Sequence, residues 1–469
     1  MRASLKLRRK FRTSDQRSAS RAVLTRNRKD ASGNPPMTKK RFTSIASRKR
    51  LAYGALTIIV LFILGAHAVL RQFSIGGTKD FHYFYHAARA MWNGSDIYAA
   101  ANGHYIYPPF LAFVLQPLAL MPEHMAAIIW IVLSGVFVFA AALIAASEAA
   151  RCWLRTGPEN DPSIPWLIAA IATLLIADKI HASFILGQTD CLMLLGFACT
   201  LSWMQRKPLL AGTIVGATAS IKYLSLIFVP YFLIKKNFRA AFGSIVAFSF
   251  FMALPAIQIG FGRAAHYMAI EFRGLGRMMG VIEAPKTAKI LKVGMDRSVS
   301  ITSSIFRVTR SNGLPDLLAA ILLLCVFVAI IAAIVFMCRR NGVPIFRPEK
   351  SDLLATNAVT SLEGTVLIFL ALAFSPQTTA RHMTLLLLIN TVAIAVFLVQ
   401  DTRTLRVLLI IAAALQVAVL SLSFRAIVAW RAVGGASWCA LGLVLAIVWS
   451  GSRVLSVNCR HRGKGNDRF

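Results

Sequence analysis

Eight polar residues that could carry chemistry fall in four short connections between apolar stretches of the chain. They are Asp80, His82, His86, Gln188, Asp190, Lys222, Arg381 and His382. Carboxylate and imidazole groups can take up a proton during a reaction, and ammonium and guanidinium groups bind anions. An ionisable group at membrane depth costs about 2.5 to 3.5 kcal/mol even on a lenient insertion scale, so such groups near the ends of apolar stretches favour a functional site.

Most of these residues also have a structural interpretation, which the sequence leaves open. Asp80 comes shortly after a Gly-Gly pair and opens FHYFYHAARAMW, where an acid could simply cap a short amphipathic helix. Asp190 could cap the apolar stretch that it opens, and Lys222 could lie along apolar surface and reach water with its charged end. His82 and His86 have the four-residue spacing of a zinc pair, but no third ligand is evident nearby, so we expect no metal.

The composition shows what kind of protein must position these residues. The chain has 469 residues, of which 57% are hydrophobic and only 15% charged, and its mean hydropathy is +0.63. Soluble domains have a charged fraction near a quarter, so this is a polytopic, all-α membrane protein. The net charge of +33 is spread over many loops and does not form one basic face, which argues against nucleic acid as a partner.

The apolar runs and the basic loops together predict the topology. Apolar runs start near residues 51, 126, 166, 189, 209, 223, 240, 315, 353, 383, 405 and 433, with a shorter one at 105–121. Loops rich in Lys and Arg stay in the cytoplasm, and six of them share one side if the shorter run does not cross. If it crossed, the basic loops at 151–155 and 205–208 would lie outside unless residues 209–234 formed one span. The Pro108-Pro109 pair supports an interfacial segment there. We therefore expect about twelve spans with both termini cytoplasmic; Glu363, the most deeply placed acid, has no assigned role.

The same topology divides the chain into three parts. We expect a basic, disordered cytoplasmic tail at 1–50, a transmembrane domain at 51–451 with external loops at 71–125 and 260–314, and a basic cytoplasmic tail at 452–469. The first tail has 17 Lys and Arg against two acids, and either Met1 or Met37 could be the true start. Five of the nine tyrosines fall within 76–110, which suits a membrane–water interface.

The order of four segments resembles glycosyltransferase family 87, also described as domain of unknown function 2029. The segments are DFHYFYHAARAMWNGSDIY (80–98), YIYPPFLAFVLQPLALMP (105–122), GQTD (187–190) and AGTIVGATASIKYLSLIFVPYFLIKKNFRAA (211–241). The resemblance extends from about residue 70 to residue 390. The family resembles mycobacterial polyprenol-phosphate-mannose-dependent mannosyltransferases. No single motif in this chain is strong, so the resemblance depends on the order of the segments.

This resemblance implies a C-type glycosyltransferase fold, an activity and a partner set. It implies an inverting transfer of a hexose, mannose first, from a polyprenyl-phosphate-linked donor to a lipid or glycan acceptor on the outer face of the cell membrane. It also implies that Asp80 is the general base and that no cofactor is needed. The remaining candidate donor- and acceptor-binding residues are Tyr85, Tyr107, Gln188, Asp190, Lys222, Arg381 and His382. The stretch beginning at Asp296 reads Asp-Arg-Ser-Val where the family suggests Asn-Gln-Ser-Leu, which leaves the acceptor open.

Two other classes of protein remain as alternatives. A transporter or flippase of lipid-linked envelope precursors would show paired inverted halves with charges near the middle of the membrane, whereas here the candidate groups fall at one face. A non-catalytic scaffold of a cell-envelope assembly would use the same polar groups only to cap helices.

Overall fold

A computed structural model describes residues 37–75, 79–154, 161–278, 293–347 and 353–466, and its regular elements are helices, with one isolated β-bridge between Ser298 and Thr379. The chain divides into two compact units, Met1–Leu51 and Ala52–Phe469, and the second contains every residue of the candidate site. The prediction of an all-α protein is confirmed.

Eight helical segments in the described ranges are long and apolar enough to cross a membrane. They belong to α2 (Met37–Ile75), α6 (Glu123–Trp153), α12 (Phe238–Ala253) with α13 (Ala256–Ile259), α16 (Asp316–Arg340), α17 (Leu353–Phe374), the 3₁₀ helix η2 (Ala380–Leu385) with α18 (Leu386–Val399), α19 (Arg403–Ser421) and α21 (Gly435–Asn466). A ninth would be the pair α7 (Ile164–Leu175) and α8 (Ala177–Leu186), which is bent by 66°. The protein is therefore a multi-pass membrane protein.

Three of the apolar runs form helices that are shorter than we expected. These are α9 (Asp190–Trp203), α10 (Pro208–Ala219) and the joined η1 (Tyr223–Ile227) and α11 (Phe228–Ile234). Since α9 has 14 residues and α10 has 12, neither reaches the roughly 20 residues that a simple span requires. By length the described residues thus contain eight or nine spans instead of twelve. The run at 105–121 gives only α5 (Pro109–Ala119), with a proline in its first turn.

The two predicted tails also differ from their expected form. Helix α2 begins at Met37, so residues 37–50 are helical where we expected disorder, and residues 1–36 lie outside the described part. At the other terminus, α21 continues to Asn466. Both basic segments therefore extend long apolar helices.

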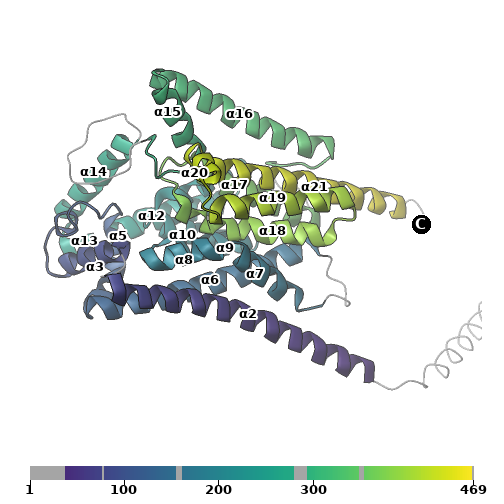
Figure 1. Ribbon diagram of the computed structural model, residues 1–469, viewed down its shortest axis with the longest axis horizontal. Helices are drawn as coiled ribbons and strands as arrows, with labels where there is room; N and C mark the ends of the chain where they lie inside the picture. Colours follow the sequence, from purple (N-terminus) through teal and green to yellow (C-terminus); the bar gives the residue numbers. More distant parts are fainter. Residues whose placement is uncertain (1–36, 76–78, 155–160, 279–292, 348–352, 467–469) are drawn as a thin grey trace, which may run out of the picture. The chain divides into compact units, whose positions relative to one another are not determined.

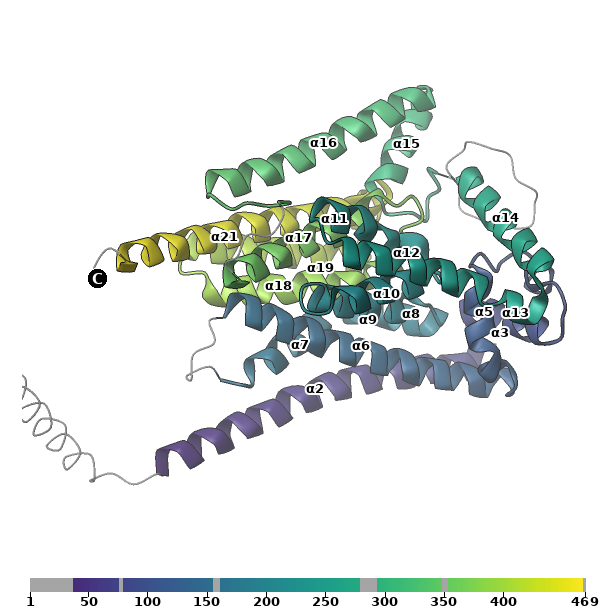
Figure 2. The ribbon, with the colours of Figure 1, turned by 180° about the vertical axis from the view of Figure 1, so that it is seen from behind.

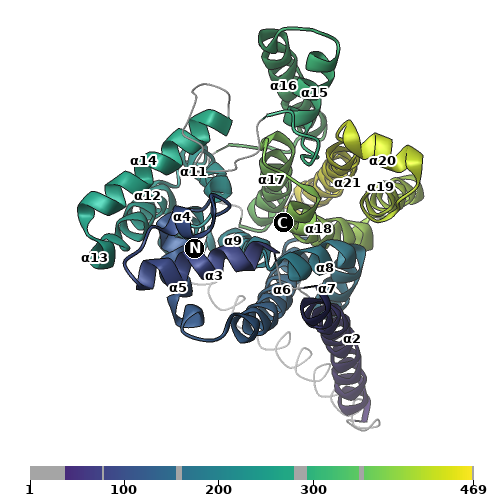
Figure 3. The same cartoon turned by 60° about the vertical axis from the view of Figure 1, so that its left-hand side comes forward.

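The helices alternate in direction, so that their connections gather at two ends. At one end lie α3 (Lys79–Trp92), α5, α13 and α14 (Phe261–Met278), while the last turns of α21 lie at the opposite end (Figure 1). The short helix α4 (Ile97–Ala100) lies beside α3 (Figure 3). The Asn237 side chain donates to the Met204 carbonyl over 3.1 Å, which ties the basic loop after α9 to the one after α11. This contact therefore holds two of the basic loops together.

Close packing of α10 on α12 positions one of those polar turns. A Cβ on Gly212 would lie 2.1 Å from the Ala240 carbonyl oxygen, and one on Gly216 would lie 2.5 Å from the Phe248 nitrogen. The small-xxx-small spacing therefore lets the two backbones touch, as it does between transmembrane helices generally. Figure 2 shows α10, α11 and α12 side by side. The turn that carries Lys222 follows directly from the end of α10.

Four of the five tyrosines in residues 76–110 are buried inside the protein. Helix α3 packs across α5 (Figure 3), and Tyr85, Tyr98, Tyr105 and Tyr107 are each no more than 8% exposed. Their hydroxyls all find protein acceptors, as buried tyrosine hydroxyls generally do. Together with Phe81 and other apolar side chains, they form a second hydrophobic core, separate from that of the long helices.

Glu363 has a structural role near the basic loops. Its carboxylate accepts from the Tyr231 hydroxyl at 2.7 Å and lies 3.1 Å from the Lys235 Nζ. It also accepts from the Phe346 amide, in the loop that follows α16. A fully buried carboxylate needs a counter-charge and several donors, and Glu363 has both. It therefore joins α17 to α11 and to that loop.

Candidate functional site

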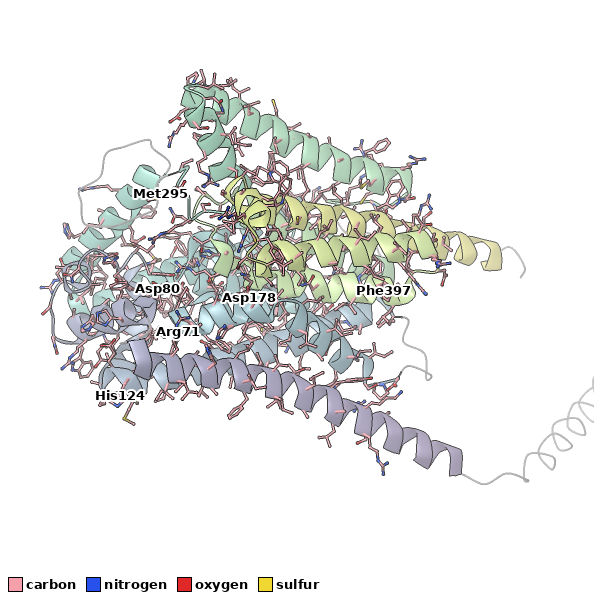
Figure 4. All side chains as sticks on the ribbon, in the orientation of Figure 1. Arg71, Asp80, His124, Asp178, Met295 and Phe397 are labelled. Carbon is pink, nitrogen blue, oxygen red and sulfur yellow. The ribbon has the colours of Figure 1, made fainter. Side chains whose placement is uncertain are left out.

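Polar side chains from four distant segments meet at the end of the structure occupied by α3. Asp80 lies at this end together with His124, whereas Phe397 lies near the other (Figure 4). Asp80 is in the first turn of α3, and Gln188 and Asp190 flank the turn between α8 and α9. Lys222 follows α10, and Arg381 is in η2. The alternation of the helices brings these connections to the same side.

Asp80 is paired with a cation and an amide. The Arg381 Nη1 lies 2.6 Å from the Asp80 Oδ2, and the Gln188 side-chain amide donates to the same oxygen. These contacts come from two other segments, so the carboxylate faces the interior of the cluster and joins elements remote in sequence. The capping interpretation does not account for them.

The surroundings of Asp80 favour its protonated form more than water does. Burial raises the pKa of the carboxyl above its ordinary value, and the nearby charge of Asp190 adds to the increase. The Arg381 and Lys222 charges act in the opposite direction without cancelling it. A carboxylate with a raised pKa holds a proton more readily, which is what a general base requires.

Asp190 forms a second ion pair beside the first. It is the first residue of α9, its side chain is 3% exposed, and its Oδ1 lies 2.7 Å from the Lys222 Nζ. The Nε2 of His382 lies 3.8 Å from the same oxygen. Because the Nδ1 of His382 accepts from the Thr379 amide, a neutral ring carries its proton on Nε2, facing Asp190. Lys222 and His382 therefore both stabilise a charged Asp190.

The turn Gly187–Asp190 links the two ion pairs. Gly187 ends α8 with φ +64°, a left-handed conformation that glycine adopts without strain, and the Trp130 indole donates to its carbonyl over 2.9 Å. This fixes Gln188, whose Oε1 accepts from the Tyr107 hydroxyl at 3.2 Å while its amide nitrogen donates to Asp80. The GQTD sequence thus orients one amide and one carboxylate toward the same cluster.

The structure unites most of the residues that the sequence predicted. It brings together Asp80, Tyr107, Gln188, Asp190, Lys222, Arg381 and His382. Tyr85 is not part of this cluster. It is buried, and its hydroxyl donates to the Met121 carbonyl over 2.7 Å, so its contacts fix α3 against the turn before α6.

Glu271 is a buried acid next to the cluster that sequence reasoning missed. Its carboxyl oxygens accept from the hydroxyls of Tyr98 at 3.2 Å and Tyr223 at 3.4 Å. Burial raises its pKa to about 8, and the two hydrogen bonds offset only part of that increase. A signal existed in the sequence, because Glu271 shares with Ala264 and Tyr267 the buried stripe of α14, which recurs every three or four residues.

The cluster can bind a further polar group. Within the described residues, Asp190 Oδ2, Arg381 Nε and the Thr189 hydroxyl are buried and have no hydrogen-bond partner in the protein. Buried polar atoms are nearly always paired, so the Arg381 Nε and the Thr189 hydroxyl fit a phosphate oxygen as acceptor, and the Asp190 Oδ2 fits a hydroxyl that donates. Both carboxylates of the cluster already pair with cationic side chains, which suits a base beside an anion site better than a metal centre.

Comparison with known proteins identifies the family. The sequence model of glycosyltransferase family 87 matches residues 105–368. The chain is 24% identical over 261 residues to the polyprenol-phosphate-mannose-dependent alpha-(1-2)-phosphatidylinositol pentamannoside mannosyltransferase of Mycobacterium tuberculosis, and the match covers 53% of this chain and 57% of that relative. No solved structure matches the chain. Because the family match extends over more than half of its 469 residues, the protein belongs to glycosyltransferase family 87.

Proposed function

We propose that this membrane glycosyltransferase moves a hexose, mannose first, from a polyprenyl-phosphate donor to a hydroxyl of a lipid or glycan acceptor. The observation that carries the proposal is the pairing of Asp80 with Arg381 beside a second pair of Asp190 with Lys222. The first pair offers a carboxylate to the attacking hydroxyl, and the second places an ammonium near a departing phosphate. The named activity of the mycobacterial relative supports the donor class.

The chemistry is a single displacement with Asp80 as general base. Asp80 takes the proton of the acceptor hydroxyl while the hydroxyl oxygen attacks the anomeric carbon. The bond from that carbon to the phosphate oxygen breaks, and polyprenyl phosphate leaves with the electron pair. Phosphate is a good leaving group, so no general acid is needed, and Arg381 or Lys222 balances its growing charge. One displacement inverts the anomeric centre.

We place this site on the outer face of the cell membrane. Phe397 lies toward the end of the structure away from Asp80 (Figure 4), and the basic segment 400–406 follows it in the chain; short basic loops remain in the cytoplasm. The proposed topology adds α9, α10 and η1–α11 to the nine described spans that include the bent α7–α8 pair, which gives twelve crossings. Both chain ends are then cytoplasmic.

A transfer assay with purified protein tests the function. Polyprenyl-phosphate mannose is supplied with a membrane extract from cells that lack the gene, and the products are read by mass spectrometry. A new mannosylated lipid or glycan, with loss of donor, is expected, and its structure identifies the acceptor. Transfer of a different hexose corrects only the sugar. If no hexose is transferred from any polyprenyl-phosphate donor while the donor crosses the membrane of sealed vesicles unchanged, the protein is a transporter.

A further inference from the structure

Two histidines of α3 lie on the side of the helix that faces away from the Asp80 cluster. At about 100° per residue, His82 and His86 are roughly 200° and 240° around the helix from Asp80. Their ring centroids are 4.3 Å apart and their rings are tilted by 65°. Two imidazoles four residues apart on one helix present nitrogens to a common point, which is the arrangement of a zinc pair.

Glu123 supplies the third group, which the sequence alone did not reveal. It lies 41 positions after His82 and opens α6. Its Oε1 is 2.7 Å from the His82 Nδ1, and its Oε2 is 3.4 Å from the His86 Nε2. One ligand atom from each of the three residues lies within 4.8 Å of the other two. Our expectation of no metal depended on a missing third ligand, and the fold provides it.

The backbone around these three residues is fixed by other contacts. The Tyr85 hydroxyl, on α3 between the histidines, holds the carbonyl of Met121 at 2.7 Å. Pro122 then sets the entry into α6 with its restricted φ of −57°. The side chains of His82, His86 and Glu123 are 46%, 36% and 34% exposed. An ion can therefore reach the group from solvent without rearrangement of the helices.

We propose that His82, His86 and Glu123 bind a zinc ion that clamps α3 to the start of α6. Two imidazoles and one carboxylate are a ligand set that zinc accepts, and the fourth position is left for water. The ion would stabilise the helix that carries Asp80 and take no part in sugar transfer. The inference is independent of the proposed function, because it concerns a different face of α3. The competing arrangement is a metal-free ion pair between Glu123 and a protonated histidine.

Zinc binding by the purified protein distinguishes the two. The full chain is prepared in detergent with an affinity tag that contains no histidine, stripped with EDTA and titrated with zinc sulfate in a calorimeter. One zinc per chain is expected, with an increase in the unfolding temperature as the ion is added. His82→Ala, His86→Ala and Glu123→Gln should each weaken binding by about tenfold or more, since even second-shell changes cost that much. His124→Ala, an exposed neighbour of Glu123, is the matched control and should bind normally.

Cobalt gives an independent reading of the same site. A tetrahedral cobalt complex formed in place of zinc absorbs strongly in the visible range, and Glu123→Gln, which preserves side-chain size, should lose that band while remaining folded by size-exclusion chromatography. The proposal is overturned if the wild-type chain binds less than stoichiometric zinc. It is equally overturned if His124→Ala weakens binding as much as His86→Ala does. The first result leaves the cluster as an ion pair, and the second shows that His82, His86 and Glu123 are not the set of residues that holds the ion.

Discussion

The guanidinium of Arg381 lies 2.6 Å from the carboxylate of Asp80, although 301 positions of sequence separate the two residues. A second pair, Lys222 with Asp190, has a similar distance of 2.7 Å. Each carboxylate is held by a cation from a different helix connection. Removal of one partner therefore leaves an opposite charge in a largely protein-enclosed site, and variants of matched size are needed to separate chemistry from folding.

Asp80→Asn should slow sugar transfer by about a hundredfold or more. Asparagine has nearly the size of aspartate and can still accept from Arg381 and Gln188, but it cannot take the proton of the acceptor hydroxyl. A positioned general base contributes roughly 10²- to 10⁴-fold to a rate. The measurement is the initial rate of transfer at saturating donor, together with donor binding, which should stay near the wild-type value.

Asp96→Asn is the matched control for that experiment. Asp96 lies in the same region and caps α4, where its carboxylate accepts from the amides of Tyr98 at 2.8 Å and Ala99 at 2.9 Å. Asparagine caps helices as well as aspartate does, so this variant should transfer sugar normally. Near-normal turnover by Asp80→Asn, or an equal loss in both variants, would show that Asp80 is not the base.

Much of the cluster could be predicted because it follows from the direction of helices. Charges in short loops indicate which helix ends share a side, and residues in connections on the same side, such as Gln188 and Arg381, are then near one another. The sequence could not decide whether the Tyr85 side chain joins the Asp80 cluster or packs elsewhere, because the packing of α3 on its neighbours determines which way the side chain points. The structure settles this through the Tyr85 contact with Met121.

Two further acids escaped prediction for a different reason. Glu123 acts through His82 and His86, and Glu271 through Tyr98 and Tyr223, so each depends on a contact between distant segments. The periodicity of α14 indicates that Glu271 is buried, but periodicity does not identify the distant residues that either acid contacts. The lengths of α9 and α10 were overestimated because the sequence stays mostly apolar beyond the residues at which each helix ends.

Lys222→Met should raise the KM for the polyprenyl-phosphate donor by roughly tenfold or more. The reason is that the variant loses a charge-assisted hydrogen bond to the phosphate, which contributes about that much to affinity. Asp190 complicates the single variant, because loss of Lys222 leaves the buried Asp190 charge without its nearest partner and destabilises the fold by about 3 to 5 kcal/mol. The informative comparison is therefore a cycle of Lys222→Met, Asp190→Asn and the double variant, each assayed for KM and unfolding temperature.

The cycle has a clear expected pattern. Asp190→Asn should keep the donor KM, because Lys222 remains, whereas the double variant should fold better than Lys222→Met alone and still bind donor weakly. If the double variant regains the wild-type KM, the lysine serves only to neutralise Asp190 and does not contact the phosphate.

Reporter fusions should place the Asp80 end of the structure outside the cytoplasm. Fusions after Pro122, Asp190 and Gly313 lie at connections on that end, and each should give the external signal with an alkaline phosphatase reporter and none with a cytoplasmic one. A fusion after Arg340, in a basic loop at the opposite end, is the control and should give the reverse. A cytoplasmic signal after Pro122 would show that residues 105–121 cross the membrane and would invert the proposed topology.

Glu271→Gln should flatten the dependence of stability on pH. The pKa of Glu271 is raised from 4.5 to about 8, first by burial, so between these values the folded protein holds a proton that the unfolded chain has released. The contribution of Glu271 to the free energy of unfolding is therefore largest below pH 4.5. It decreases by about 1.4 kcal/mol per pH unit as the pH rises from 4.5 to about 8, and it is constant above that.

The measurement is the difference in unfolding free energy between wild type and Glu271→Gln from pH 5 to pH 9 in detergent. Glutamine stays neutral and its carbonyl can still accept from Tyr98. The unfolding free energy of the variant relative to that of the wild type should therefore increase with each rise in pH and be highest above pH 8. Asp401→Asn changes an exposed acid in a loop and should leave the wild-type profile in place. Parallel profiles for Glu271→Gln and wild type would mean that Glu271 is ionised throughout, and that its two tyrosine hydroxyls suffice to hold a buried charge.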